Sequence, residues 1–164
     1  MKRLWLLRHL KSSWDEPGLA DHDRPLAPRG RKAGKRVREW AADHDVRPDL
    51  VLCSTAVRAR ATLDLVAPAL GAPAVAFEDS LYHAWAEDLL ERVQGVAPDV
   101  ESVLLIGHNP GFHDLVALLA PPGPEDFPTG ALAELLVAAD DWRDLQAGGA
   151  ELGRLVVPRE LGAG

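Results

Sequence analysis

The sequence has very little cysteine and no long apolar run. One cysteine among 164 residues cannot form an internal disulfide, so a reducing compartment is the default expectation. No apolar run approaches the roughly 18 residues of a membrane-spanning helix. The run behind the basic N-terminus is interrupted by Arg8 and is too short for a signal peptide. We therefore expect a cytoplasmic protein with no membrane partner.

Aromatic residues are also sparse, at 5% of the chain, and the net charge is −7. The charge is uneven, since residues 1–40 carry eleven Lys/Arg and five Asp/Glu, whereas the remainder is strongly acidic. A cationic N-terminal quarter in an acidic protein indicates an anion site, although the basic residues from 29 to 38 would also fit a solvated helix face. Because aromatics do not interleave this basic run, nucleic acid is not an expected partner.

The apolar residues alternate between strand-like and helix-like patterns. Strands are expected at 4–7, 48–54, 74–77 and 102–107, and helices at 28–44, 56–70, 86–96 and just after Pro110. Ser54 is a candidate cap for the second helix, and residues 131–139 fit either a helix or a strand. This alternation predicts an α/β fold with a largely parallel sheet, and the length fits one domain over residues 1–164.

Cationic side chains follow three of the predicted strands. Arg8 and His9 end the first, Arg58 lies just beyond the second, and His108 follows the strong strand at 102–107. In open α/β sheets, sites form at the carboxyl ends of strands. One such residue alone would be unremarkable as a cap or surface group, but the conjunction of two arginines and two histidines indicates a site.

These residue types suit phosphoryl transfer. A neutral imidazole is a competent nucleophile, and guanidinium groups match phosphate oxygens and stabilise the charge of the transition state. Helices that begin after Ser54 and Asn109 would add backbone N–H donors to the same anion.

At these residues the chain resembles the histidine phosphatase superfamily, whose fold is shared with cofactor-dependent phosphoglycerate mutase. The pieces that carry the resemblance are LLRHLKS (6–12), CSTAVRARATL (53–63) and LLIGHNPG (104–111). Three further pieces resemble the small SixA-type phosphohistidine phosphatases: DHDRPLAPRGRKAG (21–34), FEDSLYHA (77–84) and FPTGALAEL (127–135). The resemblance implies a three-layer sandwich with a mostly parallel central sheet, and no inserted cap domain.

The resemblance also implies roles for individual residues. His9 would become phosphorylated, while Arg8, Arg58 and His108 would hold the phosphoryl group. Further candidates for contacting phosphate or substrate are Ser12, Asn109 and Thr129. Ser12 and Thr129 could equally cap turns, and Asp23 and Arg24 are expected to fix the loop over the site.

A general acid is the missing part of the pattern. Larger members of the superfamily place a carboxylic acid after the third strand, where this chain reads EDSLYHAWAED (78–88). Glu78 and Glu87 are candidates without a convincing position, and Tyr82 or His83 could face the site instead. The small phosphohistidine phosphatases are similar in having no dedicated acid.

Two other chemistries are weaker interpretations. Cys53 precedes Arg58 by four intervening residues, one fewer than the phosphate loop of cysteine phosphatases, so Cys53 is expected to be a buried strand residue. His108 and His113 could suggest a metal, but Arg8 and Arg58 would repel a cation.

We therefore expect a metal-independent hydrolase without a cofactor, in which a phosphohistidine enzyme forms and is hydrolysed. The preferred substrate is phosphohistidine in a protein. The alternatives are a small-molecule phosphomonoesterase on the same residues and a phosphate-binding module without turnover. A monomer is favoured.

Overall fold

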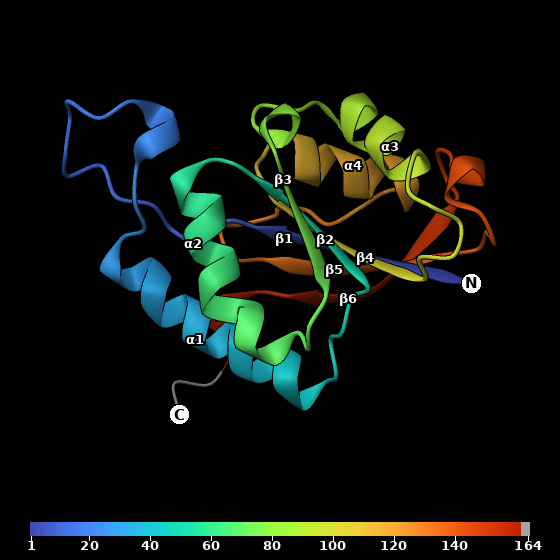
Figure 1. Cartoon of the computed structure of the whole chain (residues 1–164), viewed down its shortest axis with the longest axis horizontal. Coiled ribbons are helices and arrows are strands. Elements are labelled where there is room, and N and C mark those ends of the chain that lie inside the picture. Colours follow the sequence, from blue (N-terminus) through green and yellow to red (C-terminus); the bar gives the residue numbers. More distant parts are fainter. Residues whose placement is uncertain (162–164) are drawn as a thin grey trace.

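A computed structural model describes residues 1–161 and contains one six-stranded sheet (Figure 1). The strands are β1 Lys2–Arg8, β2 Leu50–Ser54, β3 Ala74–Glu78, β4 Ser102–Gly107, β5 Leu132–Val137 and β6 Ala150–Val156. The α-helices are α1 Pro28–Asp43, α2 Val57–Val66, α3 Ala86–Gln94 and α4 Gly111–Leu119. Short 3-10 turns lie at Asp21–Asp23, Ala67–Ala69, Asp79–Leu81, Trp142–Asp144 and Pro158–Glu160.

The sheet is mostly parallel, with the strand order β3-β2-β4-β1-β5-β6. Strands β1 to β4 run parallel, β5 pairs antiparallel with β1, and β6 pairs antiparallel with β5. The carboxyl ends of β2, β4 and β1 are therefore neighbours at one edge, which is the arrangement that the strand-end argument requires.

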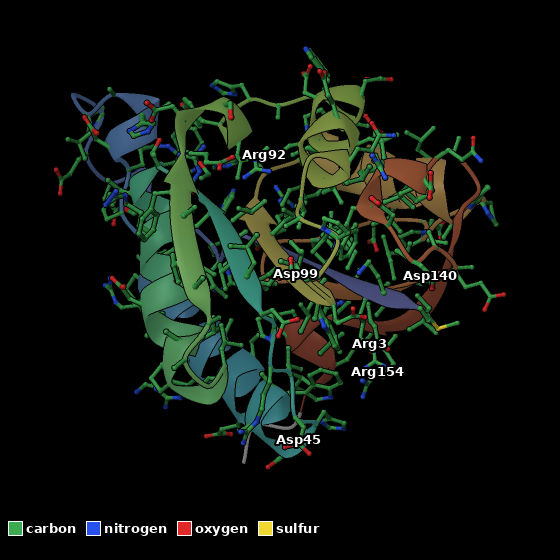
Figure 2. All side chains as sticks on the ribbon, turned by 45° about the vertical axis from the view of Figure 1, so that its right-hand side comes forward. Arg3, Asp45, Arg92, Asp99, Asp140 and Arg154 are labelled. Carbon is green, nitrogen blue, oxygen red and sulfur yellow. The ribbon has the colours of Figure 1, made fainter. Side chains whose placement is uncertain are left out.

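The segment at 131–139, which fitted either a helix or a strand, forms β5. Its apolar residues are buried on both sides of the strand, as in the middle of a covered sheet. Glu134 is also buried, and it forms ion pairs with Arg154 at 3.0 Å and with Arg3 at 3.3 Å. Figure 2 shows these two arginines side by side at this part of the sheet. A buried carboxylate in a strand is thus paired rather than functional.

Helices cover both faces of the sheet. Along β1 the side chains alternate, so that Leu4 and Leu6 pack with α3 and α4, while Trp5 and Leu7 pack with α1 and α2. This arrangement confirms the predicted three-layer α/β fold. No helix within residues 1–161 combines the length and apolar character needed to cross a membrane.

The predicted cap of the second helix is wrong. Helix α2 begins at Val57 with Ala56 as its N-cap, and Ser54 is the last residue of β2. The Ser54 hydroxyl accepts a hydrogen bond from the Ala56 N–H at 3.2 Å, a turn contact that closes the strand before the helix starts. Ser54 thereby stays at the carboxyl end of β2, where its hydroxyl contacts His108.

Candidate active site

The carboxyl edge of the sheet carries a cavity of about 490 Å³. Eight sequence-predicted candidates line this cavity, namely Arg8, His9, Ser12, Arg58, His83, His108, Asn109 and Thr129. They come from the ends of β1 and β4, the start of α2, and the loops at 79–85 and 120–131. Residues separated by more than 100 positions in sequence are therefore brought to one place.

His9 is buried just after β1, with its ring fixed by the backbone. Its Nδ1 lies 2.7 Å from the carbonyl oxygen of Leu10. Since a carbonyl only accepts, Nδ1 carries the proton and Nε2 keeps its lone pair. Burial, reinforced by Arg58 and Arg8, lowers the pKa of His9 to about 4. The ring is therefore neutral at pH 7, in the form that can act as a nucleophile.

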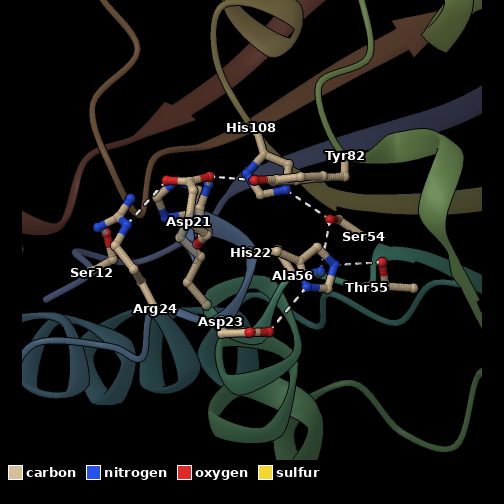
Figure 3. A network of polar contacts seen from close by, with 12 residues as sticks. Ser12, Asp21, His22, Asp23, Arg24, Ser54, Thr55, Ala56, Tyr82 and His108 are labelled. Carbon is tan, nitrogen blue, oxygen red and sulfur yellow. Dashed lines mark hydrogen bonds and ion pairs between the residues drawn. The ribbon is translucent and has the colours of Figure 1, made fainter. Parts of the chain in front are cut away.

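His108 stands beside His9, with 5.2 Å between the ring centroids. Its Nε2 lies 2.7 Å from the Ser54 hydroxyl, which already accepts the N–H of Ala56 (Figure 3). Ser54 can thus donate its own proton to Nε2, which places the His108 proton on Nδ1. Burial, followed by the effect of His9, lowers the pKa of His108 to about 3. A neutral His108 presents Nδ1–H as a donor, and that atom is buried with no partner in residues 1–161.

Arg8 and Arg58 flank the histidines. Arg8 donates from Nη1 to the Phe127 carbonyl at 3.0 Å, and Arg58 donates from Nη1 to the Asp21 carbonyl at 2.7 Å. Burial, and then Arg58, lowers the pKa of Arg8. The Nε atoms of both arginines are buried without a partner among the described residues. Orphaned buried donors are rare, and here they surround a cavity of a size suited to an anion.

Asp21 is the site residue that the sequence analysis missed. Its carboxylate accepts a hydrogen bond from Arg58 at 3.0 Å. It also accepts hydrogen bonds from Arg24 at 3.1 Å and from the Tyr82 hydroxyl (Figure 3). The Tyr82 bond, followed by Arg58, holds the pKa of Asp21 well below its usual range. Asp21 is therefore an ionised partner of the arginines at neutral pH, and it is not a proton donor.

The expected loop carboxylate was Asp23, which lies elsewhere. The Asp23 carboxylate lies 3.5 Å from Nδ1 of His22 and is largely exposed. The spacing Asp21–Arg24 was a readable signal, because residues three apart meet in a single turn.

Arg24 fixes the loop over the site, as expected. It donates to the Ser12 hydroxyl at 2.7 Å and stacks on the Trp14 ring, with 3.5 Å from Cζ to the ring centroid. Trp14 is largely exposed and lines the cavity together with Ser12. Because its hydroxyl already accepts from Arg24, Ser12 also has a structural contact.

The two candidate acids do not reach the cavity. Glu78 forms a two-pronged ion pair with Arg92, at 2.7 and 2.8 Å, and Arg92 is labelled near the end of β3 in Figure 2. Glu87 lines a different surface hollow with Trp85. The residue of this segment that does line the cavity is His83, whose backbone adopts the left-handed conformation with φ 62°.

Asn109 has a structural contact as well as a place in the cavity wall. Its amide donates to the Phe127 carbonyl at 2.8 Å, and its side-chain oxygen accepts from the His113 N–H at 3.2 Å. His113 binds the Pro124 carbonyl at 2.8 Å through Nε2 and does not line the cavity. Within residues 1–161 no group of three or more His, Cys, Asp or Glu side chains is placed to hold a metal ion.

Cys53 is a fully buried residue of β2 that does not line the cavity. Burial raises the pKa of its thiol to about 12, so the thiolate required of a nucleophile is scarce at neutral pH.

Comparison with known proteins identifies the family. Residues 4–82 match the profile of the histidine phosphatase superfamily (branch 1). An uncharacterized protein of Mycobacterium tuberculosis is 37% identical over 163 residues, which cover 93% of this chain and 100% of the relative. A solved structure from Nakamurella multipartitia, described as a candidate phosphohistidine phosphatase SixA, is 30% identical and has a TM-score of 0.84, with 96% of each chain covered. This chain belongs to the histidine phosphatase superfamily.

A second similar solved structure is that of the protein histidine phosphatase SixA in complex with tungstate. It is 26% identical to this chain, with a TM-score of 0.81 and coverage of 96% of this chain and 97% of that one. The two superpositions confirm the phosphoglycerate mutase-like fold and the likeness to SixA phosphatases.

Proposed function

We propose that this protein is a phosphatase that removes the phosphoryl group from phosphohistidine in proteins, through a phosphohistidine on His9. The observation that carries the proposal is the state of His9, a buried neutral imidazole whose Nε2 is left as the nucleophilic nitrogen. It lines one cavity with two cationic arginines.

In the proposed reaction, Nε2 of His9 attacks phosphorus in line with the leaving group. The N–P bond forms as the bond from phosphorus to the leaving group breaks, and the leaving group takes its proton from solvent. Arg8 and Arg58 hold the equatorial oxygens, and Nδ1–H of His108 donates to one of them. Water then attacks the phosphohistidine, which releases phosphate and restores the neutral ring.

A phosphohistidine substrate is favoured because no carboxylic acid from residues 78–88 lines the cavity. An alkoxide leaving group needs a proton, whereas a phosphoimidazole departs easily. The likeness to SixA phosphatases, which extends over 96% of the chain, supports the same choice. A small-molecule phosphomonoesterase on the same residues is the second candidate, favoured by the fact that His83 lines the cavity where it could supply a proton.

We propose three further properties of this protein. The chain acts as one domain without an inserted cap, it works as a monomer, and it needs neither a metal nor an organic cofactor. Arg8 and Arg58 support the metal-free part, because the positive charges of half-buried Arg8 and buried Arg58 disfavour a cation in the cavity.

The test uses a histidine-phosphorylated protein and p-nitrophenyl phosphate with wild type and His9→Ala. We expect the wild type to release phosphate from both, and His9→Ala to lose at least ~10³-fold in kcat/KM, given the worth of covalent and electrostatic catalysis. A quenched wild-type reaction should contain an acid-labile, alkali-stable phosphoryl group on His9. An acid-stable phosphoprotein, or phosphate on another residue, would overturn the mechanism. Binding without turnover would favour the phosphate-binding module.

A further inference from the structure

A second cavity, of about 390 Å³, adjoins the candidate active site. Five cationic residues line it, namely Lys11, Arg29, Lys32, Arg36 and Arg159. No Asp or Glu is among its lining residues, and it shares Lys11 and Thr129 with the active-site cavity. Three of the six basic residues from 29 to 38, namely Arg29, Lys32 and Arg36, therefore line a hollow, and the other three do not.

The geometry of α1 creates this cluster. Arg29, Lys32 and Arg36 follow one another at spacings of three and four, so they share one face of the helix. Gly30 lets the first turn of α1 lie on the backbone behind the nucleophile, since a Cβ at that position would be 2.2 Å from the Lys11 carbonyl oxygen. The Ala27 N–H donates to the same oxygen at 2.9 Å. The N-terminus of α1, which carries the cationic face, is thus held against the backbone of Lys11, two residues beyond His9.

This arrangement is unfavourable for the helix itself. The first turn of α1 contains no acidic residue, although the helix dipole favours negative charge there. Like charges three and four residues apart also repel each other. Within residues 1–161 none of Lys11, Arg29, Lys32 and Arg36 lies within 4.0 Å of a carboxylate. An anion from outside the chain would compensate this repulsion.

We propose that this cavity is a second anion subsite, which binds acidic side chains next to the phosphohistidine of a protein substrate. The inference rests on the proposed function and adds a feature of the substrate. Lys11, Arg29 and Lys32 are exposed, long side chains that can reach carboxylates on another protein. The remaining walls consist of small or aliphatic groups such as Pro128 and Pro158, with no aromatic ring on which a nucleobase could stack. An acidic peptide therefore fits this surface better than a nucleotide.

The test compares two phosphohistidine peptides that differ only in their flanks, which carry Asp and Glu in one and Asn and Gln in the other. We expect wild type to favour the acidic peptide in kcat/KM by about 3- to 10-fold, the scale of two or three exposed ion pairs. The double variant Lys32→Gln/Arg36→Gln should reduce this ratio below about 2-fold. Lys35→Gln/Arg38→Gln is the matched control, because it removes the same charge from the same helix outside the cavity and should keep the ratio.

Other outcomes separate the subsite from the proposed function. Equal rates for the two peptides in wild type would overturn the subsite, as would a ratio that survives in the cavity variant or falls equally in the control. If neither peptide is hydrolysed while p-nitrophenyl phosphate is, the proposed function fails. In that case the unphosphorylated acidic peptide should still inhibit p-nitrophenyl phosphate hydrolysis more strongly in wild type than in the cavity variant. If the enzyme prefers a small bisphosphate over its monophosphate but does not distinguish the two peptides in kcat/KM, the cavity does not bind acidic side chains of a protein substrate and the proposal is overturned.

Discussion

The carboxylate of Asp21 lies 3.0 Å from Nη2 of Arg58 and accepts its hydrogen bond. The same carboxylate accepts bonds from Arg24 and Tyr82. In the proposed mechanism Arg58 must donate to a phosphoryl oxygen, so Asp21 both orients the guanidinium group and places a negative charge at the cavity wall. The orientation of Arg58 favours phosphate binding, whereas the negative charge of Asp21 opposes it. A substitution can separate these two effects.

Asp21→Asn should make inorganic phosphate a stronger inhibitor. The amide oxygen can still accept from Arg58, and the backbone bond from Arg58 to the Asp21 carbonyl, at 2.7 Å, is untouched. The substitution removes the repulsion between carboxylate and phosphate, together with the hydrogen bond that Asp21 accepts from Arg24, a residue that does not hold the phosphoryl group in the proposed mechanism. Because the Asp21 side chain is 43% exposed, water screens this repulsion, and we expect a change of about 2- to 10-fold.

The measurement is the inhibition constant of inorganic phosphate against p-nitrophenyl phosphate hydrolysis. Asp23→Asn is the matched control, because Asp23 lies beside His22 and does not line the cavity. Weaker inhibition of Asp21→Asn than of wild type would show that orientation of Arg58 outweighs the charge.

The pH dependence should reflect the lowered pKa of His9. The nucleophile must be neutral, and burial lowers the pKa of this ring to about 4. Activity is therefore retained as the pH falls through 6.5, where an ordinary histidine protonates, and is lost near pH 4. Because kcat/KM reports ionisations of the free enzyme, its acid limb is the relevant measurement, after correction for the substrate's own ionisation. An acid limb near pH 6.5 that is unrelated to the substrate would mean that His9 is more hydrated than this structure has it.

Most of the fold was predictable because its signals are local. The strands β1, β2 and β4 are short apolar runs, and the rule that parallel strands end at one edge placed Arg8, His9, Arg58 and His108 together. Residues 131–139 fitted either a helix or a strand, because an apolar run that is buried on both faces shows no hydrophobic period. The pairing of β5 with β1 makes this segment a strand.

The rest of the site depends on contacts that local patterns do not contain. Asp21 reaches Arg58 and Tyr82 across 37 and 61 residues of sequence, so its place in the site was not predictable, although its spacing to Arg24 was a local signal. Glu78 was a reasonable acid by position, but its ion pair with Arg92 in α3 turns it away from the cavity. Which of several carboxylates enters the site is thus determined by tertiary contacts and not by the local sequence.

Cys53→Ser should retain most of the activity. Cys53 is fully buried, its thiol is protonated at neutral pH, and it does not line the cavity. The substitution places a hydroxyl in the core, so a loss of stability of about 1–3 kcal/mol is expected while kcat/KM changes little. Thermal unfolding and p-nitrophenyl phosphate hydrolysis, measured on the same sample, separate the two effects. A variant that stays folded but is inactive would point to a cysteine nucleophile after all.

The reaction rate should depend strongly on the leaving group of the substrate. General acid catalysis typically contributes ~10²–10⁴-fold when an alkoxide must be protonated, and no carboxyl group from residues 78–88 lines this cavity. Alkyl phosphates should therefore react slowly, while phosphohistidine and p-nitrophenyl phosphate, whose leaving groups depart easily, should react well. We expect kcat/KM to fall steeply as the leaving-group pKa rises across a series from nitrophenyl to alkyl phosphates.

Two substitutions complete this test. Glu78→Gln weakens the ion pair with Arg92, and Glu87→Gln alters a residue in another hollow, so each should change the p-nitrophenyl phosphate rate by less than ~10-fold, below the usual worth of a catalytic acid. His83→Gln is the informative comparison, since His83 lines the cavity. If the leaving-group dependence is steep in wild type and unchanged by His83→Gln, solvent supplies the proton. A flat dependence that becomes steep only in His83→Gln would make His83 the acid and would move the small-molecule phosphomonoesterase ahead of the phosphohistidine phosphatase.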